Sequence, residues 1–185
     1  MIRALAVCAA ILVTAASPPA YSQQRSNRAL ANVVSAYEQM SRRYDPITSA
    51  SEGDRAALRR MPDASREGDL AYRTELVALR ARLERVPTRG LNDDDALNRS
   101  YLLRVIDQTI ESIDLDFSRA SFGNGGGFFS AGSYLAYTTP IQSGDDAEAW
   151  IARLEALPTY YQQGIANARR GIATGYTQPR IVTER

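Results

Sequence analysis

The stretch SGDDAEAWIARLEALPTYYQQGIANARRGIATGYTQPRIV, residues 143–182, decides the fold class. Its apolar and small residues recur every three or four positions, which is the pattern of one face of an amphipathic helix. They are Ala147, Trp150, Ile151, Leu154, Leu157, Tyr161, Gly164, Ile165, Ala168, Ile172 and Gly175. Ser143 can cap the start, Gly175 and Pro179 mark the end, and Pro158 either kinks one helix or begins a second. We expect a packed helical arm of a larger fold; the alternative is a helix that contacts substrate directly.

Two glycines lie on the predicted face of this helix. Helix propensity would not select Gly164 and Gly171. Because neither has a side chain, each would allow another helix to approach closely. The pattern therefore predicts a packing seam along residues 143–175.

Three longer helices are predicted upstream, over residues 28–44, 65–86 and 93–117, with a short one at 54–60 and a loop at 47–53. Each long helix carries an apolar stripe at helical spacing. The short connection between the second and third predicts an antiparallel pair. Asp93, Asp94 and Asp95 follow Asn92, and a helix start explains this acidic triplet better than a cation site does. The sequence thus predicts an all-α antiparallel bundle.

Residues 118–142 form a long predicted loop in which glycines alternate with aromatic residues. The candidate site residues are Gly125, Gly126, Gly127, Phe128 and Phe129, as a loop beside a peptide-binding cleft. A phosphate cradle is excluded, because no strand precedes the cluster and no Lys-Ser or Lys-Thr pair ends it. The alternative is a tight turn between two helices with its aromatic side chains packed back against the fold.

The N-terminus has the features of a secretory signal peptide over residues 1–22. Arg3 precedes an apolar run from Ala4 to Ala16 that is too short to span a bilayer, and Ala20 and Ser22 fit a cleavage site before Gln23. An uncleaved anchor is the alternative. Residues 23–185 then form the helical domain, in a periplasmic or secreted location, with no membrane span after cleavage of the leader.

Composition excludes several kinds of chemistry. The chain has no histidine, which removes nucleophile systems that rely on histidine and the usual zinc ligands. The only cysteine, Cys8, lies in the predicted leader, so the mature chain has no disulfide. The net charge of +1 gives no reason to expect nucleic-acid binding. Asp114, Asp116 and Ser118 resemble the start of a calcium loop, but Arg119 stands where that loop needs glycine. We expect no catalytic, cofactor-binding or metal-binding residues.

Several landmarks occur in an order that resembles a bacterial protein family, the domain of unknown function 885. They are Tyr44-Asp45-Pro46, Glu52-Gly53-Asp54, the helix with Asn98, Tyr101 and Leu102, Gly126-Gly127-Phe128-Phe129, residues 150–154, residues 158–161 and residues 171–180. The last run, GIATGYTQPR, is the most specific. Together the landmarks span nearly all of the predicted mature chain.

The resemblance implies a zinc-metallopeptidase-like parent with a helical body and a His-Glu-x-x-Gly-His-His motif far downstream of the matched part. Since this sequence stops at Arg185, we expect a truncated, exported member of the family. It would comprise the helical N-terminal domain, inactive alone, with the zinc of the full-length family absent. Its expected partner is the missing catalytic half, or a second copy through residues 143–175. The alternative is a free-standing periplasmic binding or scaffolding module.

The predicted leader can be tested on exported protein. Mass spectrometry should identify Gln23 as the first residue, because Ala20 and Ser22 place small side chains where signal peptidase requires them. A membrane-bound product that begins at Met1 would contradict this prediction.

Overall fold

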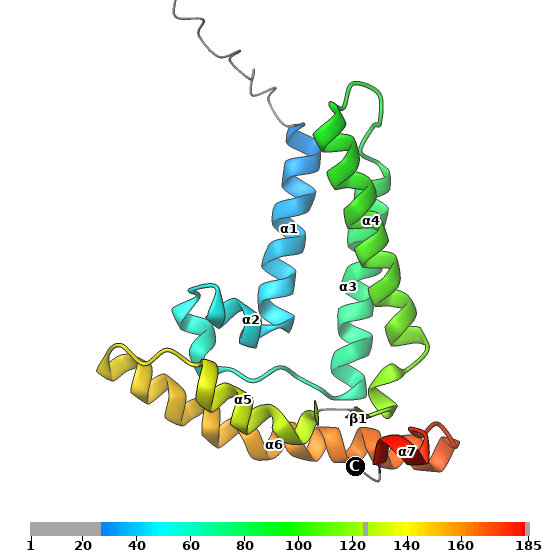
Figure 1. Ribbon diagram of the computed structural model, residues 1–185. Coiled ribbons are helices and arrows are strands. Elements are labelled where there is room, and N and C mark those ends of the chain that lie inside the picture. The colour runs from blue at the N-terminus through cyan, green and yellow to red at the C-terminus, as the bar shows by residue number, and fades with distance from the viewer. Residues whose placement is uncertain (1–26, 124–125, 184–185) are drawn as a thin grey trace, which may run out of the picture.

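The computed structural model describes residues 27–123 and 126–183. Three long helices form an upright bundle, and the longest helix lies across its lower end (Figure 1). The elements in chain order are α1 (Arg28–Tyr44), α2 (Pro46–Ser51), η1 (Arg55–Arg59), α3 (Arg66–Glu84), α4 (Asp93–Asp114), η2 (Phe117–Arg119), β1 (Phe122–Gly123), β2 (Gly126–Gly127), η3 (Phe128–Ser130), α5 (Ala131–Thr138), α6 (Gly144–Thr174) and α7 (Arg180–Thr183). The all-α fold class is confirmed. The predicted signal peptide lies outside the described residues.

The upright bundle consists of α1, α3 and α4, and the predicted apolar stripes form its core. The core residues are Leu30, Val33, Met40, Leu76, Leu79, Leu83, Val86, Leu102, Ile106 and Ile113. The predicted helix over 28–44 is confirmed with the same bounds, whereas α3 and α4 end slightly before the predicted positions. The Asn92 side chain caps α4 by accepting a hydrogen bond from the backbone N–H of Asp95 at 2.7 Å. The acidic triplet therefore occupies a helix start, as predicted.

Helix α6 is one continuous helix of 31 residues that passes through Pro158. The sequence left open whether this proline begins a second helix, and the structure shows that it does not. At its start, the Ser143 hydroxyl accepts from the Asp146 N–H at 3.2 Å. At its end, Gly175 has a φ of 69°, a left-handed conformation that favours glycine. Both predicted ends of the helix are confirmed.

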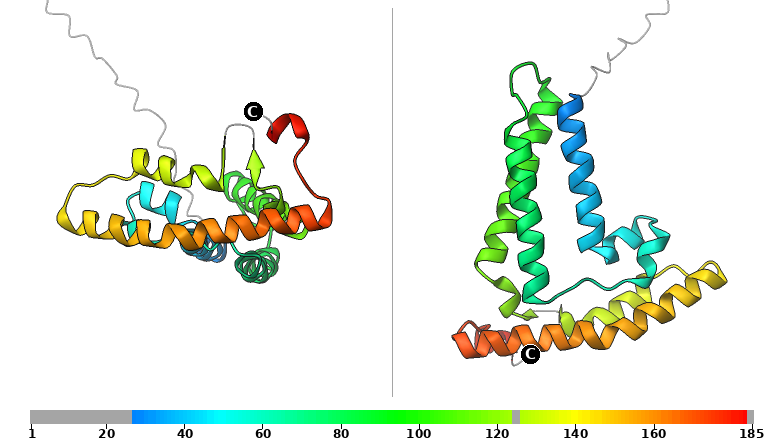
Figure 2. Two further views of the ribbon diagram at one scale, coloured as in Figure 1. Left: turned by 90° about the horizontal axis from the view of Figure 1, so that it is seen from below. Right: turned by 180° about the vertical axis from the view of Figure 1, so that it is seen from behind.

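A second block of short helices packs on the N-terminal half of α6, apart from the bundle core (Figure 2). It contains α2, η1 and α5, and a small apolar cluster of Ala50, Ala57, Leu58 and Ala149. The prediction of a loop over residues 47–53 was wrong for α2. Asp45 caps α2 by accepting from the Thr48 N–H at 3.0 Å, and Pro46 occupies the first turn, where its missing N–H costs nothing. The short helix predicted at 54–60 is present as η1.

The predicted loop over 118–142 is only partly irregular. It contains η2, a hairpin in which Phe122 pairs with Gly127 and Gly123 with Gly126, η3 and the eight-residue helix α5. Helix α5 escaped prediction because Leu135 is its only buried residue, so it has no apolar stripe to detect. Its stability comes from packing on its neighbours, which a local pattern does not show.

The face that α6 buries differs from the face that its apolar spacing predicted. The buried residues are Asp146, Ala149, Arg153, Leu157, Gly164, Asn167 and Gly171, a stripe in which small and polar side chains predominate. Within the described residues, the elements closest to the two glycines are the short 3-10 turns η3 and η2 rather than a second α-helix. An added Cβ would lie 2.4 Å from the Phe128 ring at Gly164 and 2.6 Å from the backbone oxygen of Arg119 at Gly171. Close packing at these positions was correctly predicted, but the partners are an aromatic ring and a turn.

Among residues 27–123 and 126–183, no helix combines the length and apolar character needed to cross a lipid bilayer.

Candidate functional site

Arg153 lies at the centre of the contact between α6 and the second block. Its side chain is buried, with 1% of its surface exposed. Its Nη2 donates to the backbone oxygens of Ala57 at 2.6 Å and Pro46 at 3.4 Å. Burial lowers the pKa of the guanidinium, and the charge of Arg60 lowers it further. This arginine therefore binds α2 and η1 to α6 by supplying donors to the carbonyls of two turns.

A similar contact fixes the segment between η1 and α3. The Ala64 N–H donates to Gln163 Oε1 at 2.9 Å, and the Ala64 oxygen accepts from Asn167 Nδ2 at 2.8 Å. Gln163 Nε2 also donates to Asp63 at 2.8 Å. Polar side chains of α6 thus replace the backbone hydrogen bonds that an irregular segment cannot form with itself.

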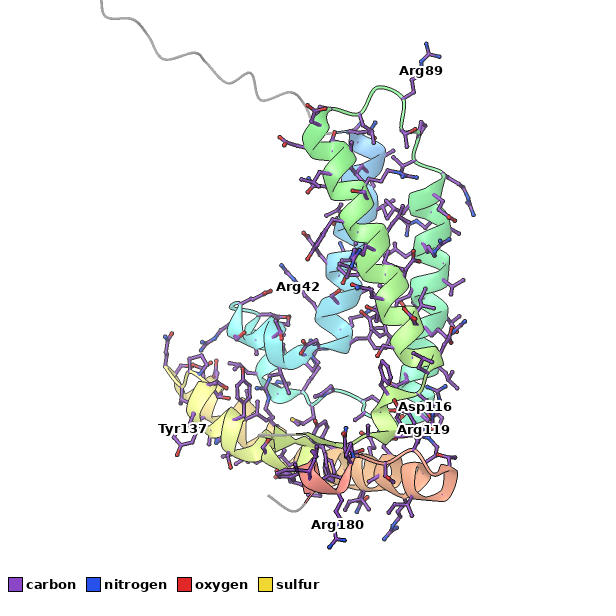
Figure 3. The ribbon with its side chains drawn as sticks, turned by 45° about the vertical axis from the view of Figure 1, so that its right-hand side comes forward. Arg42, Arg89, Asp116, Arg119, Tyr137 and Arg180 are labelled. Carbon is purple, nitrogen blue, oxygen red and sulfur yellow. The ribbon has the colours of Figure 1, made fainter. Side chains whose placement is uncertain are left out.

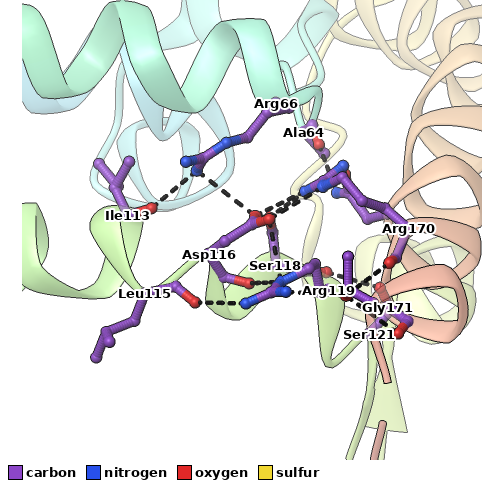
Figure 4. A network of polar contacts seen from close by, with 12 residues as sticks. Ala64, Arg66, Ile113, Leu115, Asp116, Ser118, Arg119, Ser121, Arg170 and Gly171 are labelled. Atoms are coloured by element: carbon purple, nitrogen blue, oxygen red, sulfur yellow. Dashed lines mark hydrogen bonds and ion pairs between the residues drawn. The ribbon is translucent and has the colours of Figure 1, made fainter. Parts of the chain in front are cut away.

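Asp116 joins the lower end of the bundle to the C-terminal half of α6 (Figures 3 and 4). Arg170 binds both carboxylate oxygens, with Nη2 to Oδ1 at 2.7 Å and Nε to Oδ2 at 3.0 Å. Arg66 and Arg119 approach the same carboxylate at 3.5 and 3.1 Å, and the Ser118 hydroxyl donates to it at 3.1 Å. One carboxylate therefore contacts three guanidinium groups, from α3, η2 and α6.

The backbone at Asp116 adopts a conformation that matches this role. Its φ is 54°, which is uncommon for a residue with a side chain, although Asp and Asn tolerate it best. This turn ends α4 and directs the carboxylate toward α6. The sequence offered no signal for the cluster, because Arg66 and Arg170 lie far from Asp116 along the chain.

The electrostatics of this cluster favour a structural role. Hydrogen bonds from Arg170 hold the pKa of Asp116 below its usual range. Burial raises the pKa of nearby Asp69, so the two carboxyl groups shift in opposite directions, as acid–base pairs do. Arg170, however, binds both carboxylate oxygens of Asp116, so we assign this carboxylate to the structure and not to proton transfer. Asp114 is likewise bound by Arg73, at 2.5 and 3.0 Å, so the run that resembles a calcium loop serves ion pairs instead.

The predicted cleft loop forms an aromatic cluster over the middle of α6. Gly125 lies outside the described residues, whereas Gly126 and Gly127 form β2, and Phe128 and Phe129 begin η3. The Phe128 ring covers Gly164, as the alternative reading of a turn with aromatics packed back requires. Phe129 is 53% exposed. Whether this loop borders a cleft stays a prediction.

Two further aromatic residues belong to the cluster. The Phe122 ring lies 5.8 Å from that of Phe128 and 5.9 Å from that of Phe129, and the Tyr161 ring lies 6.4 Å from Phe128. The Tyr161 hydroxyl accepts from the Gly132 N–H at 3.1 Å. The sequence placed Phe122 in the loop and Tyr161 on the helix face, but it could not show that they meet. We take Phe122, Phe128, Phe129 and Tyr161 as the aromatic cluster, the candidate binding site.

The described residues do not form a metal centre. Over 27–123 and 126–183, no three Asp, Glu, His or Cys side chains gather where they could hold an ion.

Comparison with known proteins yields one match. A family model described as "Bacterial protein of unknown function (DUF885)" matches residues 46–185. No curated protein and no solved structure matches the chain.

The Asp116 cluster predicts a pH-dependent contribution to stability. Asp116→Asn should lower the free energy of unfolding by about 2–3 kcal/mol at pH 7, because three guanidinium groups lose their shared anion. Asparagine tolerates the positive φ, so the backbone is not strained. Since the folded pKa lies below the unfolded value of about 3.9, the carboxylate stabilises the fold above about pH 4, and this contribution disappears as pH falls through the folded pKa.

Urea denaturation between neutral and acidic pH measures this effect. The difference between wild type and Asp116→Asn should shrink toward low pH, whereas Glu148→Gln, at an exposed position of α6, should match wild type throughout. A difference that stays constant with pH would contradict the assignment.

Proposed function

Because the chain belongs to DUF885, a bacterial protein family of unknown function, we propose that it is the helical, non-catalytic part of an exported metallopeptidase-like protein. Its role in this proposal is to hold a peptide at the aromatic cluster. The zinc ligands and the general base come from polypeptide outside residues 1–185. The predicted leader over residues 1–22 supports export, and the resemblance to the family supports the link to peptide hydrolysis.

The residues present do not fit a zinc centre. The sequence has no histidine, and its only cysteine, Cys8, lies in the predicted leader. Within the described part of the chain, the acidic side chains do not cluster in threes. We therefore assign no step of hydrolysis to this chain.

The observation that carries the proposal is the exposure of two stacked rings at the hairpin. Phe122 and Phe129 are 43% and 53% exposed, although a folded domain tends to bury large aromatic side chains. At Gly127 the missing side chain lets the Phe129 ring pack directly on the backbone, since an added Cβ would lie 2.8 Å from that ring, and the exposed parts of the two rings are the surface that a peptide would contact. Phe128 fixes the position of the rings by packing on Gly164.

A second candidate function, a free-standing scaffolding module, is favoured by a different surface. The apolar residues on the outer side of α6 remain in contact with solvent. A scaffold needs such a surface to bind another polypeptide.

Peptide binding can be tested with fluorescein-labelled casein as an unfolded probe. Wild-type chain should raise its fluorescence anisotropy, and Phe129→Ala should weaken binding about two- to tenfold, the effect expected for loss of an aromatic contact. Tyr137→Ala is the matched control, because Tyr137 is 90% exposed on α5 and points away from the fold (Figure 3). Equal affinity for all three proteins would contradict the proposal.

The same samples test the proposal that this chain holds no catalytic zinc centre. After incubation with zinc and dialysis to remove unbound metal, atomic spectroscopy should find no stoichiometric zinc on the protein. Casein should also remain intact, because no histidine is available as a ligand. Stoichiometric zinc together with cleavage would show that this chain holds a catalytic centre.

A further inference from the structure

The outer side of α6 carries an apolar stripe that the described fold leaves uncovered. Ile151, Leu154, Ile165 and Ile172 are between 40% and 71% exposed, and Pro158 lies exposed between them. Their spacing of three, four and seven places them on one side of the helix, about a third of a turn from the buried face. Seen from below, α5 and α6 lie side by side at the base of the molecule with the bundle behind them (Figure 2). We call Ile151, Leu154, Pro158, Ile165 and Ile172 the outer stripe.

Charges beside the outer stripe are separated by sign along the helix. Glu148 and Glu155 lie exposed in the N-terminal half of α6, and Arg169 lies exposed in the C-terminal half. The thirteen-residue sequence between Glu155 and Arg169, ALPTYYQQGIANA, contains no charged residue. No ion pair within the described residues engages Glu155 or Arg169. The outer side is therefore acidic at one end, apolar along its length and basic at the other end.

A surface with this arrangement is complementary to itself when one copy is reversed. We propose that two copies of this chain associate through antiparallel packing of their outer stripes, with a two-fold axis near Gln162. Ile151 of one protomer then lies opposite Ile172 of the other, and Pro158 lies opposite Ile165. Glu155 of each protomer lies beside Arg169 of the other. Such a two-fold interface uses the same patch twice.

The charges select the antiparallel arrangement over the parallel one. In a parallel pair each Glu155 would face a second Glu155 and each Arg169 a second Arg169, and like charges across an interface oppose association. In the antiparallel pair, both ends gain opposite charges. This inference goes beyond the proposed function and concerns a different surface, because the aromatic cluster packs on the buried side of α6 at Gly164.

Sedimentation equilibrium of the purified protein over a range of concentrations tests the proposal. Wild type should be a dimer, and Ile172→Arg should shift it to monomer. Glu155→Arg and Arg169→Glu should each raise the dissociation constant at least about tenfold, since each reversal creates two like-charge contacts by symmetry. The double variant should restore the wild-type constant to within about threefold.

Glu111→Arg is the control for charge reversal, because Glu111 is exposed on α4 in the bundle, and it should dimerise as wild type does. Circular dichroism should show the same helical content for every variant. Phe129→Ala should leave the dimer unchanged, so failure of peptide binding and failure of dimerisation are separable. A monomer at all concentrations would overturn the proposal and leave the stripe to another polypeptide. A dimer that withstands Ile172→Arg, or one that the double variant does not restore, would overturn it as well.

Discussion

The hydrogen bonds from α6 side chains to backbone groups of α2, of η1 and of the segment before α3 are the contacts on which the arrangement of this fold depends. Arg153 donates to the carbonyl of Ala57, and Asn167 and Gln163 bind both backbone groups of Ala64. The bundle and the second block have separate apolar cores. Apolar contact alone would therefore not hold them in one orientation. Directional bonds from a single continuous helix position both blocks, and Asp116 completes the junction with Arg170.

The sequence predicted the bundle well because its helices carry their signals locally. Apolar spacing, Asn92 as a cap and the short connection between α3 and α4 all lie within a few turns of the residues they affect. Helix α2 and helix α5 were missed because six- and eight-residue helices leave no readable stripe. The buried face of α6 was predicted only in part, at Leu157, Gly164 and Gly171. Its most apolar residues were expected to pack, whereas Arg153 and Asn167 face inward because carbonyls about a hundred residues away require donors.

The candidate site was likewise predicted in part from the sequence. Composition singled out Gly126, Gly127, Phe128 and Phe129. The structure packs the two phenylalanines with Phe122 of β1, over the middle of α6. The sequence could not choose between a cleft loop and a packed turn, and each description fits different residues. Phe128 packs inward on Gly164, while Phe129 remains exposed. The periodicity of the sequence predicted the apolar residues of the outer stripe. Their exposure to solvent was shown only by the structure, in which α6 buries a more polar face.

Hydrogen exchange of an Arg153→Met variant tests most directly whether α6 positions the second block through its polar contacts. Methionine fills similar space but leaves the carbonyls of Pro46 and Ala57 without donors, at a cost of about 1–3 kcal/mol. The account predicts that amides of α2 and η1 exchange about ten- to a hundredfold faster, while those of α3 and α4 keep their wild-type rates. Unchanged exchange in α2 and η1, or an equal acceleration in the bundle, would contradict it.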